Sequence, residues 1–467
     1  MKGASLGFYG GVDEVTGANF LLRTGGANLV IDCGLSHGKF FDNYRPFYDT
    51  ETSEESFSPE ALFGYRPTSI DAVFITHAHI DHIGRLPRLV REGFSGPVYS
   101  TPATKELSRL MLIDALGIMT EEARRRGLEP LYAREDIART MSLWQTKDYH
   151  RTWPIGDGVS ARFLDAGHIL GSAMVEFSRA ARKIVFTGDL GNSPAPLLPE
   201  TEKISGAHYL VMESVYGDRN HEDRAERRRR LAEAIADTAA RKGTLLIPSF
   251  ALQRTQILIL EIHRIFTAGE APSMPVYLDS PLAAAVTEIF YKYRHLFNAR
   301  VRAEMAGGEK IFDYPHFVEV KTPEESYRLS RKKGPKIIMA SSGMSVGGRV
   351  LAHERVLLER KKTIFLFVGY QARGTLGRLI QDGRKKLRID GRRVRVKAEI
   401  RTLRGYSAHK DRDNLFRFVA DAADTLEEVF VVMGEPESSA SLAKKIRDGL
   451  SLSVRTCRRG EIVEIDF

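Results

Sequence analysis

Nine residues, Thr76 to Gly84, place the strongest constraint on how this chain of 467 residues can fold. The segment reads THAHIDHIG and holds three histidines and one carboxylate, at His77, His79, Asp81 and His82. It follows the apolar, β-branched run DAVFIT, which predicts a buried strand, and it precedes apolar residues at helical spacing. The segment is therefore expected on a strand-to-helix turn, where neighbouring side chains can converge on one point.

Such a cluster predicts a metal site. Metals of borderline softness favour imidazole nitrogen and carboxylate oxygen, and zinc binds both at about 2.0–2.2 Å. The alternative is a polar loop with incidental histidines, which is the usual explanation of a lone histidine. Neighbouring imidazoles have no other common reason to crowd the end of a strand, so we adopt the metal site.

Three further candidate residues lie at the ends of other expected strands. Asp32 closes the strand NLVID, His168 lies in AGHILGSA, and Asp189 lies in FTGDLG. His168 and Asp189 each follow a glycine, which permits a sharp turn and a close backbone approach. Each residue alone has an ordinary explanation as a turn, cap or core residue, but three of them beside a histidine cluster indicate one convergent site.

The composition limits the class of protein. A mass of 52.3 kDa suggests two or three domains. The net charge of +9 and a pI near 9.3 are compatible with a nucleic-acid partner. Only Cys33 and Cys457 are present, which excludes a disulfide framework. No segment has the apolar length of a membrane span, so we expect a cytoplasmic protein without a membrane partner.

The order of elements suggests an α/β protein with one domain inserted in another. Residues 1–205 alternate strands, turns and helices and hold the histidine cluster. From about residue 206 to 397, strands and helices alternate regularly, which predicts a parallel sheet flanked by helices. Residues 398–467 form a smaller layered unit that we expect to complete the first domain.

The segment from Arg384 to Arg401 is strongly basic. In RRVRVKAEIR, Arg393, Arg395, Lys397 and Arg401 alternate with apolar residues, which places the cations on one face of an expected strand. A solvated sheet face is one interpretation, and a wall that faces phosphate groups is the other.

With these residues placed, the sequence resembles the metallo-β-lactamase superfamily. The matching pattern is an aspartate at a strand end, then H-x-H-x-D-H, a later histidine and a later aspartate. Segments in the second half resemble the β-CASP branch of nucleases, and most closely its prokaryotic members that are similar to the mRNA 3′-end cleavage endonuclease. They are ESVYGDR, PSFALQRTQ, DSPLA, SSGMSVGGR, GYQARGTLGR and GYSAH. The resemblance implies an αββα metallo-β-lactamase sandwich with an inserted parallel-sheet β-CASP domain.

The resemblance also implies a role for each site residue. His77, His79 and His168 would bind a first zinc ion, and Asp189 would bridge to a second ion held by Asp81 and His82. Asp32 would orient a ligand imidazole. Manganese is an expected substitute for zinc. The branch expects a further histidine in a V-H-G-E turn, but this chain has Met433 there, so the second metal is expected to bind more weakly.

The implied reaction is hydrolysis of a phosphodiester in single-stranded RNA, endonucleolytic or from the 5′ end. Water activated by the metals attacks phosphorus, and the products carry a 5′-phosphate and a 3′-hydroxyl. We expect His409 to be the general acid, oriented by Glu213, with Asp81 as a third catalytic residue. Phosphate contacts are expected from Arg254, Ser341, Ser342, Gly343 and Arg373.

Other functions are compatible with the same motifs. The branch includes Artemis-like nucleases that act on DNA and catalytically silent RNA-binding subunits. A small-molecule hydrolase would share the metal motif but would not need the motifs of the inserted domain. A homodimer is suggested by the resemblance alone.

Overall fold

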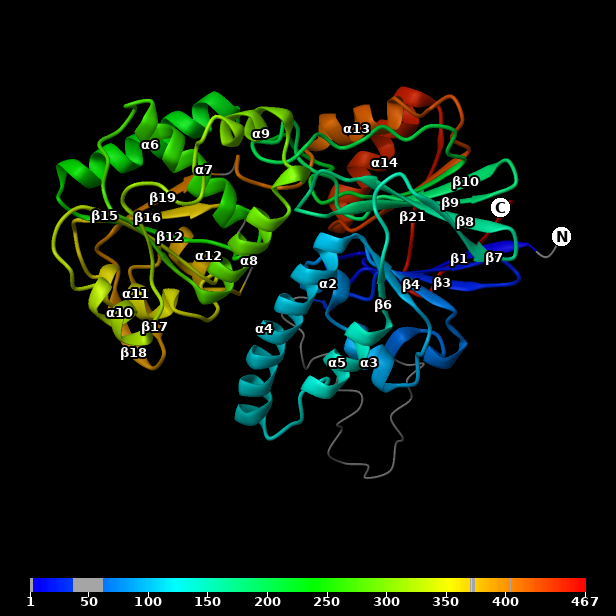
Figure 1. Cartoon of the computed structure of the whole chain (residues 1–467), viewed down its shortest axis with the longest axis horizontal. Helices are drawn as coiled ribbons and strands as arrows, with labels where there is room; N and C mark the ends of the chain where they lie inside the picture. The colour runs from blue at the N-terminus through cyan, green and yellow to red at the C-terminus, as the bar shows by residue number, and fades with distance from the viewer. Residues whose placement is uncertain (1–2, 37–61, 370, 372–373, 404) are drawn as a thin grey trace. The chain divides into compact units, whose positions relative to one another are not determined.

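The chain divides into two units, one inserted in the other (Figure 1). The computed structural model describes residues 3–36, 62–369, 371, 374–403 and 405–467. Unit 1 consists of residues 1–220 and 409–467, and unit 2 consists of residues 221–408.

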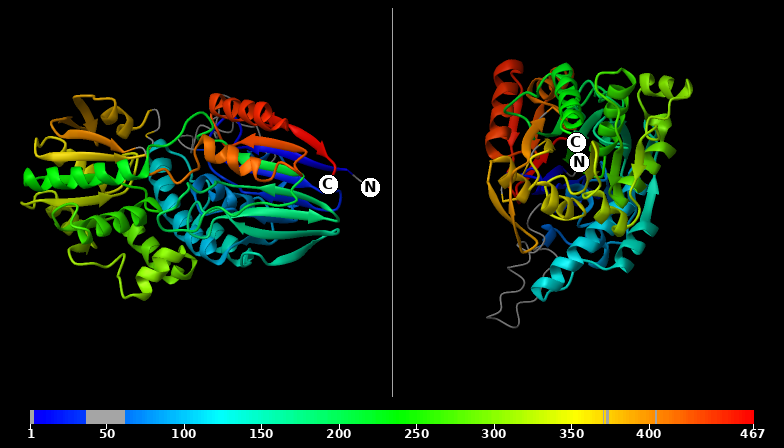
Figure 2. Two further views of the ribbon diagram at one scale, coloured as in Figure 1. Left: turned by 90° about the horizontal axis from the view of Figure 1, so that it is seen from above. Right: turned by 90° about the vertical axis from the view of Figure 1, so that its left-hand side faces the viewer.

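Two seven-stranded sheets form the centre of unit 1. The first has the order β22 (Ile462–Ile465), β1 (Ala4–Gly10), β2 (Asn19–Arg23), β3 (Asn28–Ile31), β4 (Ala72–Phe74), β5 (Val98–Ser100) and β6 (Trp144–Thr146). The second has the order β21 (Ser453–Thr456), β20 (Glu428–Val432), β11 (Tyr209–Glu213), β10 (Arg182–Phe186), β9 (Ala173–Arg179), β8 (Val159–Asp165) and β7 (Thr152–Gly156). Because β1 and β22 pair antiparallel, the two ends of the described chain lie side by side (Figure 2).

Unit 1 has four layers, and a hydrophobic cluster fills each of the three spaces between them. One cluster fills the space between the two sheets and includes Phe8, Phe74 and Phe177. A second joins the first sheet to its helices, and a third joins the second sheet to its helices. These helices are α2 (Ile80–Ile83), α3 (Leu86–Arg91), α4 (Pro102–Arg126) and α5 (Arg134–Leu143) beside the first sheet, and α13 (Arg412–Ala420) and α14 (Pro436–Leu450) beside the second. The αββα arrangement expected from the sequence is present.

Unit 2 is built on a six-stranded parallel sheet. Its order is β14 (Phe317–Glu319), β13 (Val276–Asp279), β15 (Lys336–Ala340), β12 (Thr244–Pro248), β16 (Thr363–Val368) and β19 (Glu399–Leu403). The helices are α6 (Arg224–Ala240), α7 (Arg254–Thr267), α8 (Pro281–Lys292), α9 (Ala299–Ala306), α10 (Pro323–Leu329), α11 (Val350–Leu357) and α12 (Leu376–Gln381). Figure 1 shows α6 and α7 on one face of the sheet and α10 to α12 on the other.

A separate two-stranded hairpin, β17 (Lys386–Ile389) and β18 (Arg392–Arg395), packs beside the sheet of unit 2. The basic alternation in the sequence therefore does not lie on one strand. Arg393 and Arg395 belong to the hairpin, whereas Arg401 lies on β19, where it pairs with Asp237 and Glu399.

The domain boundaries expected from the sequence, after residues 205 and 397, fall earlier than the limits of the compact units. Strand β11 follows residue 205 but pairs with β10 and β20 in the second sheet of unit 1. Strand β19 follows residue 397 but pairs with β16 in unit 2. Strand pairing thus places β11 in unit 1 and β19 in unit 2. The sequence could not assign them, because an apolar strand can complete either sheet.

Candidate metal centre

His77 follows β4 and is oriented by residues at the neighbouring strand end. Asp32, after β3, accepts hydrogen bonds from the backbone N–H and the hydroxyl of Thr76, both at 2.8 Å. The Thr76 hydroxyl lies 3.0 Å from Nδ1 of His77, and the opposite ring atom, Nε2, lies toward the other ligands. The sequence analysis gave Thr76 no role, although a hydroxyl residue directly before the first histidine was a usable signal.

The turn after β3 comes so close to the histidine segment that only glycine fits. A Cβ on Gly34 would lie 1.5 Å from the backbone oxygen of Asp81. Gly188, before Asp189, has φ +53, and a Cβ there would lie 2.6 Å from the Thr76 side chain. Gly34 lets two strand ends of the first sheet approach each other, and Gly188 does the same for strand ends of the two different sheets.

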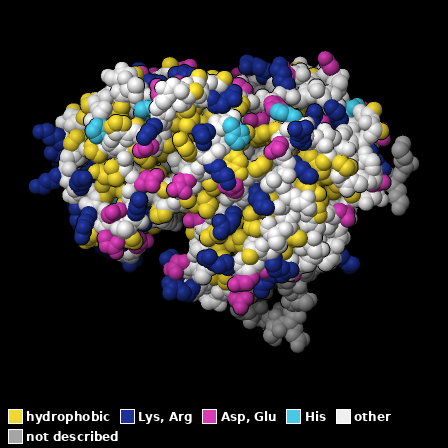
Figure 3. Space-filling view, in the orientation of Figure 1, with side chains coloured by type: hydrophobic (Ala, Val, Ile, Leu, Met, Phe, Trp, Pro, Cys, Tyr) yellow, Lys and Arg dark blue, Asp and Glu magenta, His cyan; other side chains and the backbone are white. Residues whose placement is uncertain are grey.

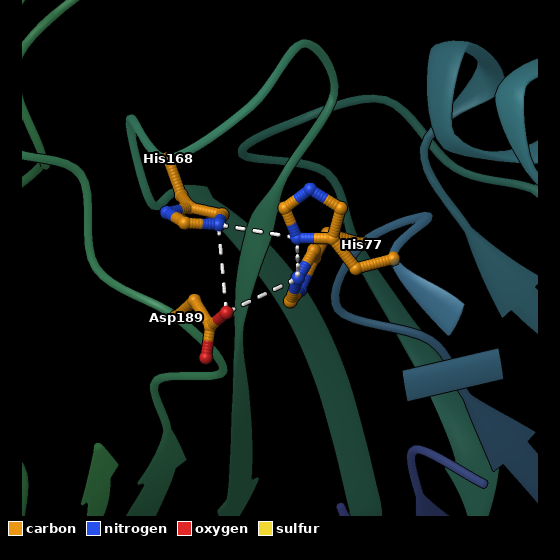
Figure 4. Close-up of side chains that lie close together, drawn as sticks. His77, His168 and Asp189 are labelled. Atoms are coloured by element: carbon orange, nitrogen blue, oxygen red, sulfur yellow. Dashed lines mark hydrogen bonds and ion pairs between the residues drawn. The ribbon is translucent and has the colours of Figure 1, made fainter. Parts of the chain in front are cut away.

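Four donor atoms from three strand ends converge. Nε2 of His77 lies 3.1 Å from Nδ1 of His79, which lies 3.4 Å from Nε2 of His168. Asp189 Oδ2 lies 3.4 Å from Nε2 of both His77 and His168. Figure 4 shows the labelled side chains directed toward one another. We call His77, His79, His168 and Asp189 the metal cluster.

The spacing of the metal cluster fits a tetrahedral metal ion. Bonds of roughly 2.0–2.1 Å to four donors require donor–donor edges of roughly 3.3–3.4 Å. Burial lowers the pKa of His77, His79 and His168, so these rings are neutral near pH 7, as metal ligands must be. Burial acts to raise the pKa of Asp189, but the neighbouring imidazoles outweigh it and hold this pKa well below its usual range.

A second pair of ligand atoms lies beside the metal cluster. Nε2 of His82 and Oδ1 of Asp189 are 3.5 Å apart, and both are buried without a hydrogen-bond partner among the described residues. The other ring nitrogen of His82 contacts Asp32 Oδ2 at 2.7 Å. Buried polar atoms without partners are costly, and a metal ion between these two would satisfy both.

Glu213 and His409 lie at the same edge of the second sheet. Nδ1 of His409 is 3.2 Å from each carboxylate oxygen of Glu213 and 3.8 Å from Asp189 Oδ2. Burial acts against protonation of His409, but the charges of Glu213 and Asp189 outweigh it and raise its pKa to about 9.

The loop after Asp189 holds this pair in place. The Leu190 N–H donates to Glu213 at 2.5 Å, and the Leu190 carbonyl accepts from the Lys410 N–H at 2.9 Å. Lys410, which the sequence analysis did not select, also donates from its side chain to Ser193 Oγ at 2.9 Å. The loop that begins at Asp189 of the metal cluster therefore also positions Glu213 and His409.

Three family models cover most of the chain. They are the metallo-beta-lactamase superfamily over residues 12–239, the Beta-Casp domain over 255–380, and the Zn-dependent metallo-hydrolase RNA specificity domain over 393–457. A curated relative, Ribonuclease TTHA0252 of Thermus thermophilus, is 35% identical over 93% of this chain and 94% of its own length. The chain belongs to the β-CASP branch of the metallo-β-lactamase superfamily.

Other relatives agree with this family. Transcription termination factor FttA of Pyrococcus horikoshii is 33% identical over 96% of this chain and 68% of that protein, and FttA of Methanosarcina mazei is 30% identical over 98% and 71%. A crystal structure of a protein of unknown function from Enterococcus faecalis V583 shares the fold, with a TM-score of 0.55 at 14% identity over 99% of this chain and all of that one.

The family and fold predictions are thus confirmed. The β-CASP protein is a metal-dependent hydrolase, and its family implies a divalent metal ion, which the donor set of the metal cluster fits. None of its described helices has the length and apolar character needed to cross a membrane.

Two predicted residues of the β-CASP protein lie beside the metal cluster. Asp81 is half-buried, and its charge helps to raise the pKa of His409. Met433 is 2% exposed within the core between the sheets and lines a small cavity with Asp32 and His82. Its N–H donates to the Gly11 carbonyl at 2.6 Å, so this turn is anchored in the core.

Four of the predicted phosphate contacts lie in the β-CASP unit, after the carboxyl ends of β12 and β15. The Ser341 and Ser280 hydroxyls are 2.9 Å apart, the Ser342 hydroxyl accepts from the Val346 N–H at 3.0 Å, and the Gly343 carbonyl accepts from Gln371 at 2.9 Å. The Arg254 guanidinium lies 4.7 Å from the centre of the Phe250 ring. Arg373 lies outside the described residues.

Proposed function

We propose that this protein is a zinc-dependent ribonuclease that hydrolyses phosphodiester bonds in single-stranded RNA. The convergence of the metal cluster with the Glu213–His409 pair carries this proposal, because it joins a Lewis-acid site to a proton donor. The similarity to a ribonuclease over nearly the whole chain supports RNA as the substrate.

Zinc is the proposed metal because three neutral imidazoles and one carboxylate at tetrahedral spacing are a typical zinc donor set. When bound, zinc would supply activation of water and neutralisation of the charge on the phosphoryl group. Manganese favours more oxygen ligands, so we expect it to be the poorer substitute.

The side chains of the protein would control the protons. Attack of water on phosphorus breaks the bond to the 3′-oxygen, which needs a proton to leave as a hydroxyl. His409 would donate that proton from Nε2, since Glu213 holds Nδ1 and keeps the ring charged. Thr76 and Asp32 would keep His77 and His82 in the orientation that presents Nε2 to the metals.

A second ion would be held by Asp81, His82 and the shared Asp189. Three protein ligands are enough for a catalytic zinc, but they leave it more exchangeable than four. The thioether of Met433 is a soft, neutral group that suits copper(I) better than zinc, so Met433 would add no ligand.

RNA would also contact the carboxyl edge of the parallel sheet in unit 2. The connections that follow the adjacent strands β12 and β15 run in opposite directions, to β13 and β16. Such a switch point is where open α/β sheets bind ligands. Ser341, Ser342 and Gly343 lie at this point and would offer hydroxyl and backbone groups to phosphates.

One experiment tests the proposal directly. The purified protein is incubated with RNA labelled at the 5′ or the 3′ end, with chelator, and after zinc or manganese is restored. We expect cleavage that the chelator stops and zinc restores, and the labelled products distinguish internal cleavage from removal of 5′ nucleotides. Cleavage of matched single-stranded DNA alone would instead identify a DNA nuclease. Binding of RNA without cleavage under all metal conditions would identify a silent binding subunit.

A further inference from the structure

The segment from Arg384 to Lys397, which we call the cationic hairpin, carries most of the net charge of the protein. It holds eight Lys and Arg residues and one acidic residue, Asp390, for a net charge of +7. The whole chain has a net charge of +9, so the remaining residues are close to neutral. The basic character that suggested a nucleic-acid partner is therefore localised in fourteen residues.

The cationic hairpin has one apolar face and one charged face. Leu387, Ile389, Val394 and Val396 are 1–8% exposed and belong to the hydrophobic cluster beneath α10 to α12. The cations alternate with these residues and are exposed. Because the apolar face is anchored in the core, the charged face is held toward solvent by a rigid element.

The register places like charges directly opposite one another. Lys386 pairs with Arg395, and Arg388 pairs with Arg393. Like charges at opposed positions destabilise a sheet, so this arrangement is not explained by the stability of the hairpin. A bound anion would remove that repulsion.

Few acidic groups neutralise the cationic hairpin. Arg392 contacts Glu359 at 3.2 Å, and Asp390 contacts Arg355 at 3.6 Å. Within the part of the chain that the structure describes, the side chains of Lys386, Arg393 and Arg395 form no ion pair. By contrast, Arg124 and Arg125, at the end of α4, both pair with Glu121. On the face drawn in Figure 3, cations are likewise scattered among acidic and apolar side chains.

We propose that the cationic hairpin is a second RNA-binding site, which holds the sugar-phosphate backbone of the substrate and takes no part in the chemistry. This inference rests on the proposed ribonuclease function. The segment contains no aromatic residue on which a base could stack, so the contact is with phosphates and is independent of sequence. The exposed face of the hairpin carries cations and its apolar side chains face the core, so this surface fits a polyanion rather than a partner that buries apolar surface.

The test compares two triple variants in an inert background, His79→Ala, so that RNA is bound without being cut. One carries Lys386→Gln, Arg393→Gln and Arg395→Gln in the cationic hairpin. The matched control carries Arg124→Gln, Arg125→Gln and Arg126→Gln, which removes three exposed cations that have acidic partners. Affinity for single-stranded RNA of mixed sequence is measured between roughly 50 and 300 mM salt.

For the hairpin variant we expect affinity to fall roughly 10- to 100-fold near 100 mM salt. The slope of log affinity against log salt should decrease by about 2, because each lost phosphate contact on a single strand removes about 0.7. The control should keep both the affinity and the slope. Matched single-stranded DNA should show the same change if phosphate is the group recognised. An unchanged slope in the hairpin variant, or equal changes in both variants, would overturn the proposal.

Two more measurements separate this inference from the proposed function and from misfolding. In the active protein, the hairpin substitutions should raise the RNA concentration needed for half-maximal cleavage and leave the single-turnover rate at saturating RNA unchanged. If the wild type cleaves RNA and the hairpin variant binds RNA as tightly as the wild type, the hairpin site is contradicted but the proposed function is not. Absence of RNA cleavage in the wild type contradicts the proposed function. The melting temperature should not fall, since the substitutions relieve like-charge repulsion.

Discussion

In the metal cluster of unit 1 the ionisable groups are largely buried and converge, whereas in the cationic hairpin of unit 2 the charged groups are exposed and spread along a surface. The metal cluster brings four donors to within 3.4 Å of their neighbours. Burial makes such groups costly unless they are paired or coordinate a metal, so their positions must be fixed by strand ends and by hydrogen bonds. The hairpin cations remain solvated and need only face the same side.

This difference in burial separates the groups that we expect to act in the reaction from those that we expect to act in RNA binding. A buried cluster acts in a low dielectric, where each charge has a large effect on the reacting atoms. An exposed cationic surface acts through counterion release, which depends on salt and tolerates changes in position. Substitutions in the metal cluster and the Glu213–His409 pair should therefore alter the rate, and substitutions in the hairpin should alter binding.

The largest expected effect is that of Asp189→Asn. Asp189 contacts both groups of metal ligands, so loss of its charge should weaken both sites and reduce RNA cleavage on the order of 10³-fold or more. Zinc content by elemental analysis should fall, while the circular dichroism spectrum and the salt dependence of RNA binding stay unchanged. Near-normal turnover by the folded variant would refute the metal assignment.

His409→Ala should lower the single-turnover cleavage rate by roughly 10²–10⁴-fold, the usual contribution of a positioned general acid. The zinc content should not change, because His409 is proposed to hold a proton and not the metal. The measurement pairs single-turnover cleavage with elemental analysis. A fall in melting temperature at an unchanged rate would assign His409 a structural role at the start of the following helix.

Met433→His tests whether the second metal is limited by its ligands. After dialysis, we expect the wild type to retain about one zinc ion per chain and the variant to retain closer to two, since a fourth protein ligand slows exchange. Met433→Leu is the control, because it keeps an apolar side chain in the core and adds no donor. Full retention of two ions by the wild type would show that this position does not limit binding.

The smallest effect concerns Glu354, a buried carboxylate that forms no ion pair within the described residues. Burial raises the pKa of Glu354 in unit 2 to about 8, whereas the imidazoles lower that of Asp189. Because the folded state holds this proton more tightly than the unfolded chain, the stability it gives is complete below pH ~4.5 and is lost as the pH rises through about 8.

Glu354→Gln should therefore melt a few °C higher than the wild type at pH 8, with a smaller difference near pH 5. Calorimetry across this range measures the effect, and Glu319→Gln, an exposed position on β14, is the control. A constant difference between pH 5 and 8 would contradict the assigned protonation.

Much of the site could be predicted from local sequence. His77, His79, Asp81 and His82 lie within six residues, so a turn of any kind keeps them close. Asp32, His168 and Asp189 were found because each ends or follows an expected apolar strand, whereas Glu213 and His409 were named only through the motifs that resemble the β-CASP branch. The inserted parallel sheet followed from the order of strands and helices, and the αββα sandwich followed from the resemblance to the metallo-β-lactamase superfamily.

Only the tertiary structure decided how these residues contact one another. Thr76 and Lys410 gained roles through hydrogen bonds to residues distant in the chain, which no periodicity reveals. Strand pairing moved β11 into unit 1 and β19 into unit 2, because an apolar strand carries no mark of the sheet it joins. The alternating sequence predicted the positive charge of the hairpin, but only the register of β17 and β18 showed that like charges lie opposite one another. Strand pairing likewise placed Arg401 on β19, in another sheet. The sequence determines which side chains are present and which face of a strand or helix they occupy. Long-range strand pairing determines which of these side chains contact one another.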